Sequence, residues 1–138
     1  MHEVVLIYSH RFSMMLMTYI LILFTTLFQL DVNNDLENRL FVALEKGNGK
    51  ELSKHFTSSV RISVNQDSRL TTKFQAELIL EDYLNSNKLV NIKKTDVSEE
   101  LSKQCIVFEA VSNRRKVRIF IKFIHLKGTD YISEFRID

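Results

Sequence analysis

Residues 116–126 read KVRIFIKFIHL, and this stretch carries the clearest structural signal in the chain. Apolar residues alternate along it with mostly charged ones, and the apolar set comprises Val117, Ile119, Ile121 and Phe123. A period of two is typical of a strand with one face in a core and the other in water. We therefore predict a half-buried strand here.

Similar strand signals surround this stretch. They occupy residues 89–97, 104–111 and 131–137, and the sequences between the strands are SEELSK, SNRR and KGTD. Short polar connections of this kind predict an antiparallel meander. An earlier strand is predicted at residues 59–64, where apolar and polar residues alternate, and the turn residues 65–68 are expected to end it.

Helical signals precede and interrupt the strands. Apolar residues recur at helical spacing in residues 33–47, a short second helix is predicted within 50–56, and a third begins at the capping-box pattern of Thr72 to Gln75. The order is helix, helix, strand, helix and four strands. It predicts an α+β domain in which three helices pack on one side of a curved, mainly antiparallel sheet that leaves a concave pocket.

The first thirty residues differ from the rest of the chain. Residues 12–30 carry no charge, with Arg11 before them and Asp31 after them. This polarity predicts insertion with the amino end inside, and hence export to the periplasm or envelope. The length of the apolar run fits both a cleaved signal and an uncleaved membrane anchor. A cleavage site needs small residues, and residues 25–29 offer only two threonines. A buried core helix is a third interpretation. We predict a signal or anchor at 1–30 and a single domain at 31–138.

Composition argues against several functional classes. The 138 residues fit one domain, and 19 Lys and Arg against 17 Asp and Glu give a net charge of +2, which does not indicate a nucleic-acid partner. The single cysteine, Cys105, allows neither an intrachain disulfide nor a cysteine-rich zinc site. The four histidines show no i, i+4 pairing, and the three glycines form no nucleotide-binding motif. We expect no metal and no cofactor.

Three segments resemble a known family. They read ALEKGNGKELSKHF at 43–56, QAELILEDYL at 75–84 and EFRID at 134–138. Together they are similar to short exported bacterial proteins that carry only a domain-of-unknown-function label. The resemblance covers about residues 35–138 and implies a nuclear-transport-factor-like fold, also called cystatin-like, with a cone-shaped sheet over three helices. The sequence departs from the family at Phe74, at Gly49 and along 94–110.

The resemblance also implies where catalytic residues would lie, because enzymes with this fold place a carboxylate or a His and Asp pair inside the cone. His125 shares the phase of Ile121 and would point inward, whereas Glu109 has the opposite phase and is expected to face solvent. Both are candidates for a general base, and a histidine bonded to backbone or water is the alternative for His125. The predicted lining of the pocket is Tyr83, Phe108, Ile121, Phe123 and His125.

A basic surface is predicted at the turn before the clearest strand and along its outward face. Its members are Arg114, Arg115, Lys116, Arg118, Lys122 and Lys127. Interleaved with Phe120 and Ile124, these cations suit an anionic polymer or lipid headgroups, although a solvated outer face and a dimer contact are also open.

These observations lead to two functional hypotheses of different classes. We expect a non-catalytic exported domain that binds a small apolar ligand or an envelope protein through the pocket or the outer sheet face. The alternative is an isomerase-like or hydrolase-like enzyme that uses His125 or Glu109 as its base. Contact with a membrane is expected only through residues 12–30, if they are not cleaved.

Overall fold

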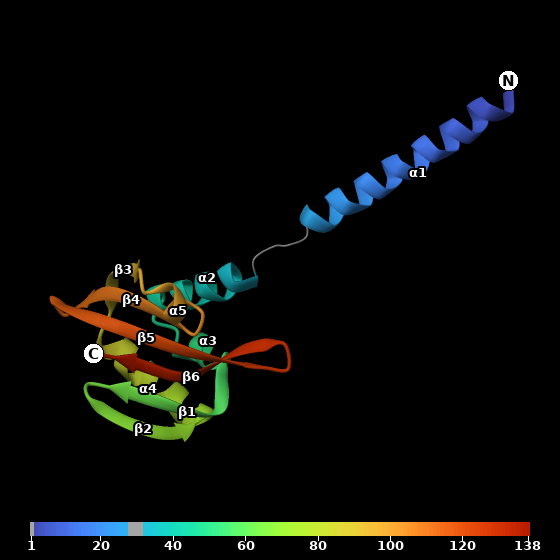
Figure 1. Cartoon of the computed structure of the whole chain (residues 1–138). Helices are drawn as coiled ribbons and strands as arrows, with labels where there is room; N and C mark the ends of the chain where they lie inside the picture. Colours follow the sequence, from blue (N-terminus) through green and yellow to red (C-terminus); the bar gives the residue numbers. More distant parts are fainter. Residues whose placement is uncertain (1, 28–31) are drawn as a thin grey trace. The chain divides into compact units, whose positions relative to one another are not determined.

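Two units make up the chain, Met1–Asp35 and Leu36–Asp138, and each is described separately. The computed structural model describes residues 2–27 and 32–138, with the side chains of 3–22 and 35–138 (Figure 1). Residues 28–31, where the first unit was expected to end, lie outside the described residues, so that division and most of the predicted cleavage junction stay predictions.

Helix α1 (His2–Leu27) dominates the first unit. Within it, Glu3–Ile22 is long and apolar enough to cross a membrane, by length and composition. A signal sequence near an N-terminus has the same property.

The three predicted helices of the domain are present, and the first of them begins four residues before the second unit. They are α2 (Val32–Glu45), α3 (Gly49–Ser53) and α4 (Lys73–Ser86). Helix α2 ends before Gly47, whose φ of 64° favours glycine. The predicted cap of α4 is confirmed, because the Gln75 backbone N–H donates a hydrogen bond to the Thr72 hydroxyl at 3.3 Å.

Six strands form one sheet in the order β2-β1-β6-β5-β4-β3. Their bounds are β1 (Phe56–Val64), β2 (Asp67–Thr72), β3 (Leu89–Thr95), β4 (Cys105–Ser112), β5 (Arg115–Leu126) and β6 (Thr129–Ile137). Every neighbouring pair is antiparallel except β1 and β6. The structure therefore confirms the α+β class and the mainly antiparallel sheet, whose strands run across Figure 1 in front of α4.

Two elements of the sequence prediction were wrong. Asn65 and Gln66, with φ of 52° and 68°, form a tight turn, and the chain returns as β2 instead of entering a helix directly. Almost every side chain of β2 is exposed, so this edge strand has no alternating pattern. The predicted connection SEELSK contains a short helix, α5 (Glu99–Ser102).

The core lies between the helices and one face of the sheet. The inward phase of β5 is confirmed, since Ile119 and Ile121 have no exposed surface. Aromatic rings pack in this core: the Phe41 centroid of α2 lies 6.2 Å from that of Phe108 in β4, and within the sheet the Phe56 and Phe135 centroids are 6.1 Å apart. Large apolar side chains thus pack in the core between the helices and this face of the sheet.

Candidate binding cleft and cationic turn

The residues predicted to line a central pocket are packing residues for the most part. Tyr83, Phe108 and Ile121 are buried in the core, with 8%, 1% and 0% of their surface exposed, and Phe123 packs against its margin. Burial raises the pKa of Tyr83, because the charged phenolate would be poorly solvated. These side chains stabilise the fold as members of the core or of its margin.

His125 does not point inward, which corrects the prediction. Its side chain is 67% exposed, and its Nδ1 lies 2.8 Å from Asp130 Oδ1 across the β5–β6 hairpin. The strand pairing shifts register between Lys122 and Phe123, and the end of β5 extends beyond the core. At this end of β5 the alternation of apolar and polar residues therefore no longer indicates which side chains are buried.

Glu109 faces solvent, as its phase predicted. Its side chain is 55% exposed and lies 3.8 Å from Arg118 Nη2, so it lies at the surface and not inside the cone. Cys105 is buried, burial raises the pKa of its thiol, and its Sγ contacts the Leu101 carbonyl oxygen at 3.2 Å. Among the described residues, no group of three or more His, Cys, Asp or Glu side chains could hold a metal.

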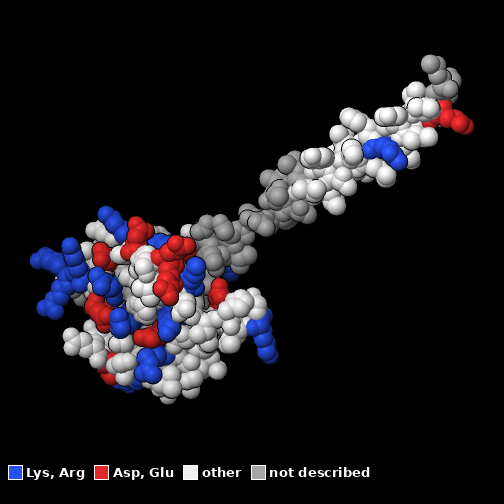
Figure 2. Space-filling model, viewed as in Figure 1, with Lys and Arg blue, Asp and Glu red and all other residues white. Residues whose placement is uncertain are grey.

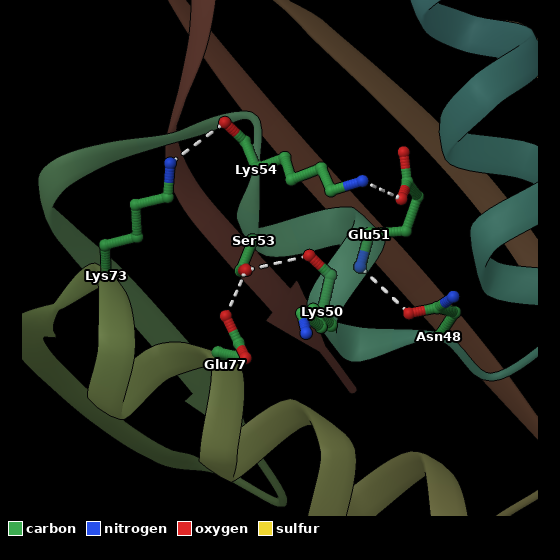
Figure 3. Close-up of polar contacts among 7 residues, drawn as sticks. All are labelled: Asn48, Lys50, Glu51, Ser53, Lys54, Lys73 and Glu77. Atoms are coloured by element: carbon green, nitrogen blue, oxygen red, sulfur yellow. Dashed lines mark hydrogen bonds and ion pairs between the residues drawn. The ribbon is translucent and has the colours of Figure 1, made fainter.

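A polar cluster joins α3 to α4 (Figure 3). The Ser53 hydroxyl lies 2.6 Å from Glu77 Oε2, and the Lys73 ammonium donates to the Lys54 carbonyl oxygen at 3.0 Å. Next to the cluster, His55 is partly buried, and desolvation lowers its pKa. All of these polar contacts connect elements of the scaffold, so we assign the cluster a structural role.

A surface hollow of about 470 Å³ lies between α2 and β3. We call it the α2–β3 cleft, and its lining residues are Phe41, Glu45, Lys88, Leu89, Val90, Asn91 and Ile92. The volume falls in the range of about 300–1,000 Å³ that is usual for ligand sites. Sequence reasoning missed this cleft, because its two walls lie more than forty residues apart in the chain.

The β3 wall of the cleft is an open sheet edge. β3 ends the strand order and pairs only with β4. The hollow is lined by five consecutive residues, 88–92, at the start of this edge strand. Asn91 has a φ of 54°, and the pairing with β4 shifts register between Val90 and Lys93, so a bulge lies inside the cleft.

Contacts between α2 and the sheet fix the two walls. The Lys94 ammonium donates to Glu37 Oε2 at 2.7 Å, which links β3 to α2. At the base, the Phe41 ring contacts Phe108 of β4. The spacing of the walls is therefore set by packing that exists without a ligand.

The structure divides the predicted basic surface into two parts. Arg114, Arg115 and Lys116 are exposed around the β4–β5 turn, where blue side chains gather at the left of Figure 2. Arg118, by contrast, lies beside Glu109, and Lys122 stands opposite Glu134 of β6. The outer face thus has mixed charge, whereas the turn is cationic.

Phe120, the aromatic residue between the cations of the outer face, has a partner in the same sheet. The Arg136 guanidinium lies 5.0 Å from the centroid of the Phe120 ring, and Phe120 is partly buried. A cation over an aromatic face is a stabilising arrangement. Phe120 is therefore already partnered within the outer face.

Comparison with known proteins identifies the family. A family model described as "Domain of unknown function (DUF4783)" matches residues 38–138. The chain belongs to this family. The resemblance seen in the three sequence segments is thereby confirmed. No curated protein matches the chain.

Solved structures of DUF4783 proteins share the fold. A protein of this family from Bacteroides fragilis is 22% identical, with a TM-score of 0.63, over 72% of this chain and 94% of its own. One from Bacteroides uniformis is 17% identical, with a TM-score of 0.64, over 73% and 94%. An NTF-2 like protein of unknown function from Silicibacter pomeroyi is 13% identical, with a TM-score of 0.51, over 76% and 90%. These likenesses establish an NTF2-like fold and carry no information on ligands.

Proposed function

We propose that this DUF4783 protein is an exported, non-catalytic binding domain that takes up an extended segment of a protein partner in the α2–β3 cleft. The observation that carries the proposal is the coincidence of a preformed hollow with an open strand edge. An unpaired edge offers backbone N–H and C=O groups to an added strand, and the adjoining hollow receives one of its side chains.

The shape of the cleft favours a segment of protein over a small apolar ligand. Small-molecule sites usually enclose most of the ligand surface in apolar walls. Here Val90 is 43% exposed, Lys88 and Asn91 are also exposed, and Glu45 contributes a charge. The bulge at Asn91 limits the regular edge to a few residues, which selects a short strand and discourages unspecific pairing.

The chemistry of the cleft supports binding without catalysis. Its ionisable side chains are Glu45 and Lys88, which belong to opposite walls. A lining of one acid and one amine on opposite walls, beside the apolar side chains of Phe41, Leu89 and Ile92, suits recognition of a protein segment.

Export is part of the proposal and rests on α1. Its apolar span would act as a signal sequence or as an anchor, with the DUF4783 domain following it outside the cytoplasm. Amino-terminal sequencing of the protein from native cell fractions tests this. A start near residue 30 in the soluble envelope fraction indicates a cleaved signal, and an intact terminus in the membrane fraction indicates an anchor. A full-length soluble cytoplasmic chain would contradict export.

The binding proposal is tested with selected peptides. Eight-residue peptides are selected on the full chain in zwitterionic detergent, and the best binder is resynthesised with N-methyl groups on alternate residues. If the peptide adds as a strand, methylation of the edge-facing amides abolishes binding, and methylation of the other set leaves it intact.

A matched pair of variants locates the site. Val90→Trp fills the cleft and should abolish peptide binding. Leu70→Trp places the same side chain on β2, the other edge strand, where the native residue is 64% exposed, and should have no effect. Equal affinity for all methylated peptides, or loss of binding in Leu70→Trp alone, would refute the proposed site.

A further inference from the structure

A cationic patch adjoins one end of the α2–β3 cleft. We define it as Lys88, Arg114, Arg115 and Lys116, all of which are exposed. Lys88 itself belongs to the cleft lining. The turn that carries the other three is fastened beside it, because the Asn113 side-chain amide donates to Asn87 Oδ1 at 2.8 Å.

The strand register gives the separation between patch and cleft. Val90 of β3 lies opposite Val111 of β4, which lies opposite Lys116 of β5. Neighbouring strands are about 4.8 Å apart, so the Lys116 backbone is roughly 10 Å from that of Val90. Leu89, the first residue of β3, pairs with Ser112 at the end of β4, so the β4–β5 turn lies at the end of the sheet where β3 begins. A strand on the free edge of β3 that runs past Lys88 therefore comes to the same end of the sheet as the turn.

Acidic side chains are missing from this part of the surface. The sequence contains no Asp or Glu in residues 86–92 or 111–118. Among the described residues, the ion pairs include none of the four patch cations. The nearest charge of opposite sign in the lining is Glu45, on the α2 wall. The patch thus holds uncompensated positive charge, whereas on the outer sheet face Arg118 lies beside Glu109.

From this charge distribution we infer that the partner segment is acidic, with carboxylates that meet the patch while an apolar side chain enters the cleft. This inference rests on the proposed function and specifies the chemistry of its partner. Electrostatic complementarity speeds encounter and fixes the direction in which a strand docks. A bilayer would also attract four cations, but it is a flat partner that makes no use of a concave cleft continuous with the patch.

Synthetic probes of defined charge test the inference. Fluorescent peptides of three Val-Glu, three Val-Ser or three Val-Lys repeats are titrated against the full chain in zwitterionic detergent, with anisotropy as the readout. We expect Val-Glu to bind at least tenfold more tightly than Val-Ser and Val-Lys to bind least, with the preference reduced at 0.5 M salt.

Two triple variants assign the effect to the patch. Replacement of Arg114, Arg115 and Lys116 by Ser should reduce Val-Glu affinity about tenfold and leave Val-Ser affinity unchanged. The control variant replaces three exposed lysines elsewhere by Ser, namely Lys50, Lys103 and Lys127. This control has the same net charge but should retain the preference.

The possible results separate the two proposals. If Val-Glu and Val-Ser bind equally, and Val90→Trp abolishes both, the cleft proposal stands and the acidic partner is wrong. If Val90→Trp affects neither peptide, the proposed function itself fails. In a parallel flotation assay, the full chain in phosphatidylcholine nanodiscs is mixed with phosphatidylglycerol vesicles. Binding to these vesicles that depends on the patch, without peptide preference, would overturn the inference in favour of lipid.

Discussion

The hydrogen bond between α3 and α4 allows a quantitative prediction. Ser53 is 2% exposed, and its hydroxyl has two acceptors, the Glu77 carboxylate at 2.6 Å and the Lys50 carbonyl oxygen at 2.9 Å, of which the charged one is closer (Figure 3). Hydrogen bonds to charged groups contribute about 1.5–3 kcal/mol. Because Glu77 is only partly buried, we expect Ser53→Ala to lower the free energy of unfolding by about 2 kcal/mol.

A double-mutant cycle isolates this contribution. Glu77→Gln retains an acceptor oxygen but removes the charge, so its cost should be about 1 kcal/mol. Once the Ser53 hydroxyl is gone, the charge at position 77 has no donor to strengthen. The double variant should therefore cost about 2 kcal/mol and not the sum, which gives a coupling of about 1 kcal/mol.

Urea unfolding of a chain that begins at Val32 is the appropriate assay. Its core lies entirely within Leu36–Asp138, and far-UV circular dichroism is suitable because the sequence has no tryptophan. Each midpoint is combined with its slope to give a free energy. Strictly additive losses, or a cost below about 0.5 kcal/mol for Ser53→Ala, would show that the contact does not stabilise the α3–α4 junction.

Three further predictions concern stability. Arg114→Gly should stabilise the domain by about 1 kcal/mol, since Arg114 has a φ of 65° that costs an L-residue about 1–2 kcal/mol; an unchanged urea midpoint would argue against strain there. Gly49→Ala should cost about 1–3 kcal/mol, because its Cβ would lie 2.8 Å from the Glu81 backbone nitrogen, and Glu81→Ala should not rescue it in thermal melts. Burial lowers the pKa of His55 from 6.5, so just below pH 6.5 only the unfolded state keeps the proton, and the free energy of unfolding should rise with pH there. In a series of unfolding curves at different pH, His55→Gln should remove this rise. An identical pH slope in the variant would refute the prediction.

Much of the scaffold is predictable because its signals are local. The helices and the alternation in β5 follow from spacing, and the cap at Thr72 follows from two residues three positions apart. β2 escapes prediction because its edge position leaves both faces in water. His125 was misplaced for a related reason, since period two indicates burial only while a strand remains over the core.

The site was less predictable than the fold. The α2–β3 cleft depends on how Phe41 packs relative to β3, and no local pattern encodes that distance. A weak signal existed at Asn91, because asparagine is uncommon within strands and tolerates a positive φ. The cationic turn was visible in the sequence, but only the structure separates Arg114 to Lys116 from Arg118, whose charge faces Glu109.

The parallel pairing of β1 with β6 affects the moment at which this protein is able to fold. The Thr57 hydroxyl bonds the Ile132 carbonyl oxygen across 75 residues of chain. Until β6 has been synthesised, β1 has only β2 beside it, and an isolated two-stranded hairpin is at best marginally stable in water. The sheet thus closes only when nearly the whole domain has left the ribosome. A nascent chain of this topology would lack its complete sheet during synthesis, and such a chain suits the passage through a secretion pore that the proposed export requires.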